Sequence, residues 1–179
     1  MNNALSKKKK RFFLLDIFLL IGLIALDQVT KYIAVLKLKN QVPYPIIPDI
    51  LELNYLENRG AAFGMLQNQK FFFVFIALVF ISLIVYFLYK TPDHKKYDSM
   101  HILLVMIAAG AIGNMIDRIR LDYVVDFIYL VCINFPIFNV ADMYVTVATA
   151  VLAIILLFVY KEDDLAFLSF KQNKIREIK

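Results

Sequence analysis

The sequence has few of the residues on which most hydrolase and metal sites are built. Its single cysteine, Cys132, excludes an internal disulfide and any site with several cysteine ligands. It contains no HExxH, no Gly-x-Ser-x-Gly and no Walker-type phosphate loop, so the usual zinc peptidase, serine hydrolase and nucleotidase signatures are missing. Carboxylates remain as the candidate groups for hydrolytic chemistry.

Charged residues are also scarce, at 20% of 179 residues, whereas 61% are hydrophobic. This balance is typical of a protein in lipid and predicts one integral membrane domain over residues 1–179. The net charge of +5 does not indicate nucleic acid, because the basic residues flank apolar segments and form no patch interleaved with aromatics.

The apolar residues form segments long enough to span a bilayer. Crossing about 30 Å of hydrocarbon takes about 20 helical residues. A basic run at residues 7–11 precedes the first segment, which continues past signal-peptide length without a small-residue cleavage site, so we expect a retained helix. The predicted fold is an all-α membrane bundle of four helices, at about 12–35, 71–89, 101–119 and 140–160.

Lysine and arginine predict the orientation of these helices. Thirteen of the 20 basic residues fall in the N-terminus, the 90–100 connection and the tail, which we therefore expect to be cytoplasmic. His94 and His101 then lie on the cytoplasmic side. The connections at about 38–69 and 120–139 are expected outside. The first contains Pro43, Pro45 and Pro48, and its alternating residues 51–56 predict a short strand.

Three of the four helices are expected to bring polar side chains to the same outer level. Charged groups within a span are costly and commonly mark functional sites. On the third helix, Gly110, Gly113, Asn114 and Asp117 recur at i, i+3, i+4 and i+7 and share a face. The polar residues at this level are Asp27, Gln28, Thr30, Lys31, Asn114, Asp117, Arg118, Asn139 and Asp142.

Several of these residues also have structural interpretations. Asp27 and Lys31 form an i, i+4 pair that would serve equally as a structural ion pair. The stretch from Gly110 to Gly113 is typical of a helix-packing seam. Asp142 would be favoured in a first helical turn by the helix dipole alone. Asp126 stands out because its neighbours are apolar.

Asp126 and Asp142 are the candidate catalytic pair. Two carboxylates in close contact share one proton, so one acts as a general base towards water while the other donates to the scissile carbonyl. Such a pair titrates as a unit. The predicted loop that carries Asp126 is joined to the fourth helix by a short connection, although the sequence leaves open whether the two side chains meet.

Five short blocks stand out along residues 27–142. They are DQVTK at 27–31, NRGAAFG at 58–64, GAIGNMIDR at 110–118, VVDF at 124–127 and FNVAD at 138–142. In these blocks and in their order the chain resembles bacterial lipoprotein signal peptidase, also called signal peptidase II.

The resemblance implies an aspartic endopeptidase of the bacterial cytoplasmic (inner) membrane that uses no metal and no cofactor. Such an enzyme removes the signal peptide from diacylglyceryl-modified prolipoprotein by cutting just before the lipobox cysteine. The resemblance also implies a small external β-cradle with a surface helix, and inhibition by the cyclic peptide globomycin. It makes Asp126 and Asp142 the catalytic pair. The substrate-binding candidates are Asn58, Gly110, Asn114, Arg118 and Asn139, and the supporting candidates are Asp27, Lys31 and Asp117.

Two departures from the family pattern are visible. Ala109-Gly110 stands where the family often has two glycines, and the connection between the two aspartates is compact. A small transporter or channel is the alternative function, with an ion path through the buried charges. Because residues 71–89 and 143–160 contain no charge, the continuous polar path that conduction needs is missing. A scaffold for membrane partners would leave the clustered carboxylates unexplained.

Overall fold

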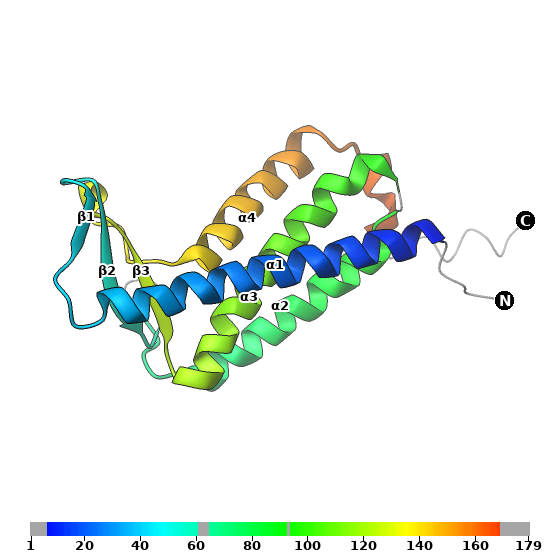
Figure 1. Ribbon diagram of the computed structural model, residues 1–179. Coiled ribbons are helices and arrows are strands. Elements are labelled where there is room, and N and C mark those ends of the chain that lie inside the picture. The colour runs from blue at the N-terminus through cyan, green and yellow to red at the C-terminus, as the bar shows by residue number, and fades with distance from the viewer. Residues whose placement is uncertain (1–6, 61–64, 93, 169–179) are drawn as a thin grey trace, which may run out of the picture.

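The structure, a computed structural model, describes residues 7–60, 65–92 and 94–168. Within these residues, four helices are long and apolar enough to span a membrane. They are α1 (Lys7–Leu38), α2 (Lys70–Lys90), α3 (Asp98–Leu121) and α4 (Val140–Phe158). The predicted four-helix membrane fold is confirmed (Figure 1). Each observed helix covers the predicted range to within a few residues, except that α1 begins earlier.

Helix α3 is the centre of the bundle, since it packs against each of the other three helices. Its buried face contains small residues, including Ala108, Ala109 and Gly110, which allow close helix approach. In α2, by contrast, Ile84 is the one buried residue, and large apolar side chains such as Phe71 and Phe75 are exposed. An outward-facing apolar helix is stable only when lipid surrounds it.

A three-stranded antiparallel sheet stands at one end of the bundle (Figure 1). Its strands are β1 (Tyr44–Ile47), β2 (Leu51–Asn58) and β3 (Val124–Leu130), in the order β1-β2-β3. The strand expected at residues 51–56 lies within β2. Ala34 of α1 and Val125 and Phe127 of β3 form the buried cluster that joins sheet to bundle.

The sequence-based expectations for Asp126 and for the surface helix both concern the external segments. Asp126 lies on strand β3 and not in the loop we expected, because the consecutive buried residues 124–127 give no alternating pattern that would reveal a strand. The surface helix expected before α2 falls partly on residues 61–64, which lie outside the described residues. Residues 65–68 form turns.

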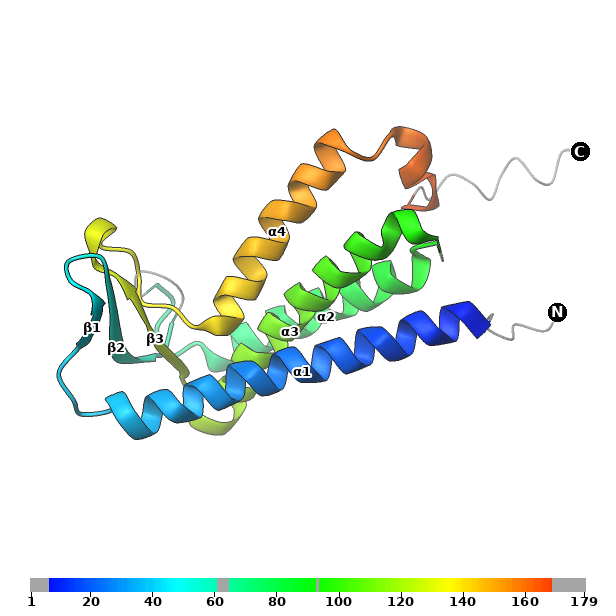
Figure 2. The same ribbon diagram turned by 45° about the horizontal axis from the view of Figure 1, so that its top comes forward.

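The end of the bundle opposite the sheet is closed by two short 3-10 helices, η2 (Lys95–Tyr97) and η4 (Glu162–Leu168) (Figure 2). The Tyr97 hydroxyl donates to the Asp164 carbonyl at 2.8 Å, and Lys96 forms an ion pair with Asp164 at 2.6 Å. Helix α1 begins at this same end (Figure 1). The basic connection that contains Lys90 and Lys95 is therefore separated from the sheet by the length of the helices.

Candidate active site

Strand β3 carries Asp126 into the junction between the sheet and the helices, where it is 2% exposed. Asn58 on the neighbouring strand β2 donates its side-chain amide to Asp126 Oδ2 at 2.8 Å, and Asn139 donates to Oδ1 at 2.6 Å. Burial, followed by the nearby negative charge of Asp142, raises the pKa of Asp126 to about 7, against the lowering effect of the two amide hydrogen bonds. This carboxyl group can therefore hold a proton near neutral pH.

Asp142 is positioned by the start of α4. Asn139 is the N-cap residue, and it forms a capping box in which the Asp142 N–H donates to Asn139 Oδ1 at 3.0 Å and the Asn139 N–H donates to Asp142 Oδ2 at 3.1 Å. Asn114 of α3 donates to Asp142 Oδ1 at 2.7 Å. Asn139 therefore binds the carboxylate of Asp126 through its side chain and the carboxylate of Asp142 through its main-chain N–H. The structure brings both predicted carboxylates to this one asparagine.

The orientations of both asparagine amides are determined by their other partners. Lys31 Nζ, which can only donate, lies 2.9 Å from Asn114 Oδ1. The amide nitrogen of Asn114 must therefore face Asp142. Asn139 Oδ1 accepts the Asp142 N–H, so its amide nitrogen faces Asp126 and Asn114 Oδ1, the latter at 3.1 Å.

Asp27, Lys31 and Asp117 form a buried supporting cluster, at 0%, 3% and 3% exposure. Lys31 Nζ lies 3.0 Å from Asp27 Oδ2 and 3.0 Å from Asp117 Oδ2. A buried ion pair needs further hydrogen bonds to compensate for its desolvation, and the main chain supplies them. The cluster thus unites the i, i+4 pair of α1 with a carboxylate of α3.

Each supporting carboxylate also holds the main chain immediately before one member of the candidate pair. Asp27 Oδ1 accepts the N–H of Ala141 at 3.0 Å, and Ala141 precedes Asp142. Asp117 Oδ2 accepts the N–H of Val125 at 3.1 Å, and Val125 precedes Asp126. Lys31 links the two supporting carboxylates. The cluster therefore sets the backbone positions of both candidate catalytic residues.

Gln28 belongs to this cluster, although our sequence-based set of site residues omitted it. Its Nε2 donates to Asp117 Oδ1 at 3.0 Å, to Asp27 Oδ2 at 3.1 Å and to the Gly113 carbonyl at 3.3 Å. Its position next to Asp27, among the polar residues of α1, could have identified it from the sequence.

Arg118 lies beside the carboxylates, but its described hydrogen bonds go to main-chain carbonyls. Its Nη2 donates to Gly60 O at 3.2 Å and its Nη1 to Asn114 O at 3.4 Å. The guanidinium carbon lies 4.5 Å from the centre of the Phe73 ring, which is a cation–π arrangement. Asn58 Oδ1 accepts the N–H of Gly60 at 3.0 Å, so Arg118 and Asn58 hold the same residue.

The two glycines of α3 are required by close packing. A Cβ on Gly110 would overlap the Ala141 carbonyl oxygen of α4, and a Cβ on Gly113 would fall 2.5 Å from Asp27 Oδ2. Gly110 therefore faces α4, which is the packing interpretation of this stretch, and its contact with substrate stays a prediction. Gly113 leaves the space that the supporting cluster occupies.

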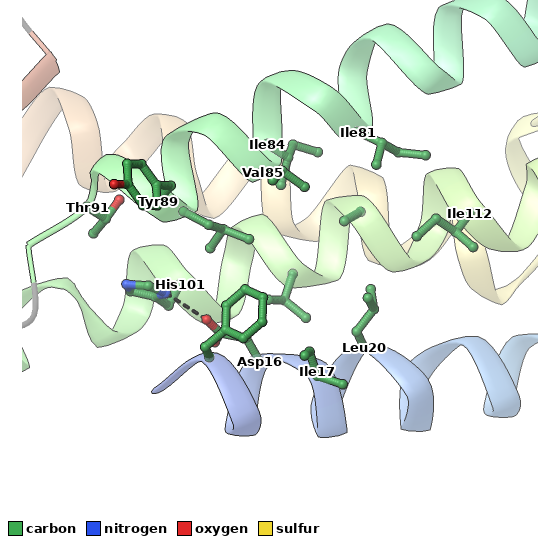
Figure 3. A pocket seen from close by; sticks show the side chains of 14 residues that line it. Asp16, Ile17, Leu20, Ile81, Ile84, Val85, Tyr89, Thr91, His101 and Ile112 are labelled. Atoms are coloured by element: carbon green, nitrogen blue, oxygen red, sulfur yellow. Dashed lines mark hydrogen bonds and ion pairs between the residues drawn. The ribbon is translucent and has the colours of Figure 1, made fainter. Parts of the chain in front are cut away.

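A cavity of about 400 Å³ lies apart from the site, among α1, α2 and α3 towards the opposite end of the bundle (Figure 3). Apolar side chains such as Ile84 and Leu20 line most of it. Asp16 and His101 also line it, and they are joined at 2.9 Å between Oδ2 and Nδ1 (Figure 3). His101 is therefore distant from Asp126 and Asp142, as the sequence predicted.

Comparisons with known proteins establish the family to which this geometry belongs. The family described as "Signal peptidase (SPase) II" matches residues 19–158. This chain belongs to the signal peptidase II family. Its described residues contain four helices fit to span a membrane, so it is a membrane peptidase.

Relatives and solved structures agree with this assignment. A lipoprotein signal peptidase from Streptococcus pyogenes serotype M5 (strain Manfredo) is 44% identical over 156 residues, which is 87% of this chain and 97% of that protein. Its counterpart from serotype M3 (strain ATCC BAA-595 / MGAS315) is 43% identical over the same lengths. A bacterial membrane enzyme solved by the in meso method at 2.3 Å resolution is 33% identical with a TM-score of 0.69, over 89% of this chain and 92% of that one. A second such structure, at 1.9 Å, gives 33% and 0.70 over 81% and 94%.

Proposed function

We propose that this peptidase is an aspartic endopeptidase that removes signal peptides from prolipoproteins, with Asp126 and Asp142 as its catalytic pair. The observation that carries the proposal is the shared contact with Asn139, which hydrogen-bonds to both carboxylates. The streptococcal relatives are named lipoprotein signal peptidases, which supports a prolipoprotein substrate. Cleavage just before a diacylglyceryl-modified cysteine is the reaction that the five sequence blocks imply.

In the proposed reaction, the pair shares one proton. The ionised member takes a proton from a water molecule, and that water attacks the carbonyl carbon of the residue before the lipidated cysteine. The protonated member donates to the carbonyl oxygen. As the tetrahedral intermediate collapses, the member that took the proton from water donates it to the leaving nitrogen, and the other member recovers its proton from the oxygen. The C–N bond breaks, which leaves a carboxyl group on the signal peptide and an amino group on the cysteine.

The polar neighbours have distinct roles in this proposal. Asn58, Asn114 and Asn139 orient the carboxylates through neutral amide donors, which stabilise a negative charge without supplying a counter-ion. Arg118 donates to main-chain carbonyls and has no hydrogen bond to a carboxylate among the described residues, so we assign it to the substrate main chain. Gly110 keeps α4 close to α3. Asp27, Lys31 and Asp117 act as positioning residues.

The cleavage test uses purified protein and diacylglyceryl-modified prolipoprotein. Asp126→Asn and Asp142→Asn are each expected to abolish cleavage, while Asp122→Asn, which alters an exposed aspartate at the end of α3, is expected to keep the parent rate. Cleavage at the parent rate by either of the first two variants overturns the pair. We also expect inhibition by a globomycin-type peptide and full activity in EDTA, since the proposed chemistry uses no metal.

The proposed orientation places the carboxylate pair at the outer face of the bacterial cytoplasmic membrane, with both termini in the cytoplasm. The basic connection at the end of the bundle opposite the sheet supports this orientation. A topology reporter fused at residue 95 is expected to report the cytoplasm, and an external signal there would invert the assignment.

A further inference from the structure

Exposed apolar side chains gather at one tip of the sheet. Ile46, Ile47 and Ile50, around the turn from β1 to β2, are 49%, 46% and 47% exposed. Ile133 of η3 (Val131–Ile133) is 65% exposed, and Phe135 just after it is 46% exposed. The N–H of Val131 donates to the Ile50 carbonyl at 2.9 Å, which holds the two segments together. We call these five apolar residues the sheet tip.

Exposing such an apolar surface to water is energetically unfavourable. Each exposed apolar square ångström costs about 25 cal/mol, and contiguous apolar patches mark docking or membrane surfaces. Charge is nearly absent here: Asp49 is the one charged residue in 42–50, and 131–138 has none. Glu52 of β2 is half-buried next to the tip, and at the other end of the sheet Glu57 pairs with Lys39 at 2.9 Å.

The backbone of the tip also has few N–H groups that would have to be desolvated when the tip is covered. Strand β1 is an edge strand, and edge strands normally present unpaired N–H groups that are costly to desolvate. Pro43, Pro45 and Pro48 have no N–H. These prolines lower the number of donors that would lose water when the tip is covered.

The position of the tip indicates what covers it. In both ribbon views the tip lies on the α4 side of the molecule, while the loop between α1 and β1 lies on the α1 side (Figures 1 and 2). The chain runs from Phe135 into α4, where Met143 and Val147 are exposed by 45% and 51%. These α4 residues belong to a membrane-spanning helix, so the tip continues a lipid-facing surface.

We propose that the sheet tip inserts into the interfacial layer of the membrane leaflet nearest the carboxylate pair. Asp49, in the turn at the end of the tip, limits the insertion to the level of the lipid headgroups. The sheet would then be anchored on two sides, by the bundle and by the lipid. Because Asn58 and Asp126 lie on β2 and β3, this second contact holds the carboxylate pair at a fixed height relative to the membrane surface.

The native cysteine provides the probe. Cys132 lies in η3 next to Ile133, is exposed, and is the single cysteine of the chain. An environment-sensitive fluorophore attached to Cys132 would be compared, in vesicles of phosphatidylcholine and phosphatidylglycerol, with the same label in Cys132→Ser/Gln41→Cys. Gln41 is exposed in the loop between α1 and β1, on the α1 side of the molecule (Figure 1).

We expect the Cys132 label to be blue-shifted, quenched by lipids that carry a nitroxide near the headgroup, and at least several-fold less accessible to aqueous iodide than the Gln41 label. Equal iodide access at both positions overturns the proposal. In Ile47→Glu/Ile133→Glu labelled at Cys132, iodide access should rise to the control level. If the label stays shielded in this charged variant, lipid insertion is not the cause.

Two other occupants give different results, and either one overturns the proposal. Shielding that appears only after prolipoprotein is added would identify the tip as a substrate surface. Shielding that disappears when the protein is diluted within the bilayer would identify a contact between two copies of this chain. None of these measurements depends on catalysis. The proposal can therefore fail while the proposed function holds, and the proposed function can fail while this proposal holds.

Discussion

Asp126 should make the stability of this protein decrease as the pH rises towards neutrality. In the folded protein its carboxyl group holds a proton up to about pH 7, whereas the ordinary value of 3.8 applies to an unfolded chain. Between these pH values the folded state binds more protons than the unfolded state. The free energy of unfolding therefore falls as the pH rises through this window, and it recovers as the pH is lowered.

The size of the effect follows from the pKa difference. Each unit corresponds to about 1.36 kcal/mol, so a rise from 3.8 to about 7 costs at most about 4 kcal/mol when Asp126 is fully ionised. That cost builds up between about pH 4 and pH 7, and about half of it falls between pH 5 and pH 7. The physical cause is the transfer of a carboxylate to a site that is 2% exposed, beside the negative charge of Asp142.

The assay is thermal unfolding in detergent at a series of pH values from 5 to 8. Wild-type protein should lose stability across this range, and Asp126→Asn should lose less, because asparagine cannot ionise. Its absolute stability is also affected by an unfavourable contact between its amide and Asn58 or Asn139, so the informative quantity is the slope with pH. Asp122→Asn is the matched control, since Asp122 is 65% exposed and Lys70 lowers its pKa. Identical slopes for wild type and Asp126→Asn would refute the reasoning.

Three further changes test the supporting contacts. Lys31→Met leaves Asp27 and Asp117 buried without their cation and should cost about 3–5 kcal/mol of unfolding free energy, measured by thermal unfolding; an unchanged melting temperature contradicts this. Gly113→Ala places a methyl group against Asp27 and should cost about 1–3 kcal/mol, whereas Gly22→Ala, with open space around it, should be neutral or stabilising. Asn139→Ser keeps an N-cap oxygen but removes the amide donated to Asp126, so kcat should fall at least tenfold with little change in melting temperature; a kcat equal to that of the wild type would mean that Asn139 is only a cap.

The sequence predicted the helices and the level of the site because both depend on composition. Apolar length determines the spans, and the cost of charge in lipid makes polar residues informative about depth. Asp27, Asn114 and Asn139 were expected at one level from these considerations alone. The structure brings them together through Lys31 and Asp142.

What the sequence left open are the contacts between polar side chains and distant main chain. The bond from the Ala141 N–H to Asp27 joins residues 114 positions apart, and no periodicity encodes it. Strand β3 was missed for a related reason. It is buried on both faces over residues 124–127, so it lacks the alternation that revealed β2. The pairing of Asp126 with Leu56 across the sheet follows only from the three-dimensional register.

The surroundings of the four carboxylates fit the different roles that we propose for them. Asp27 and Asp117 each form an ion pair with the ammonium group of Lys31, at 3.0 Å. Asp126 and Asp142 accept hydrogen bonds from the neutral amides of Asn58, Asn114 and Asn139 instead.

Amide donors orient a carboxylate without opposing its protonation as strongly as a cation does. A lysine placed against Asp126 would hold it ionised and remove the acid that the reaction needs. The arrangement keeps the cation one step away: Lys31 reaches Asp142 only through Asn114, whose amide it orients. In the proposed reaction, the buried ion pairs of Lys31 therefore fix the backbone, and proton exchange takes place at the two carboxylates that have no hydrogen bond to a cation among the described residues.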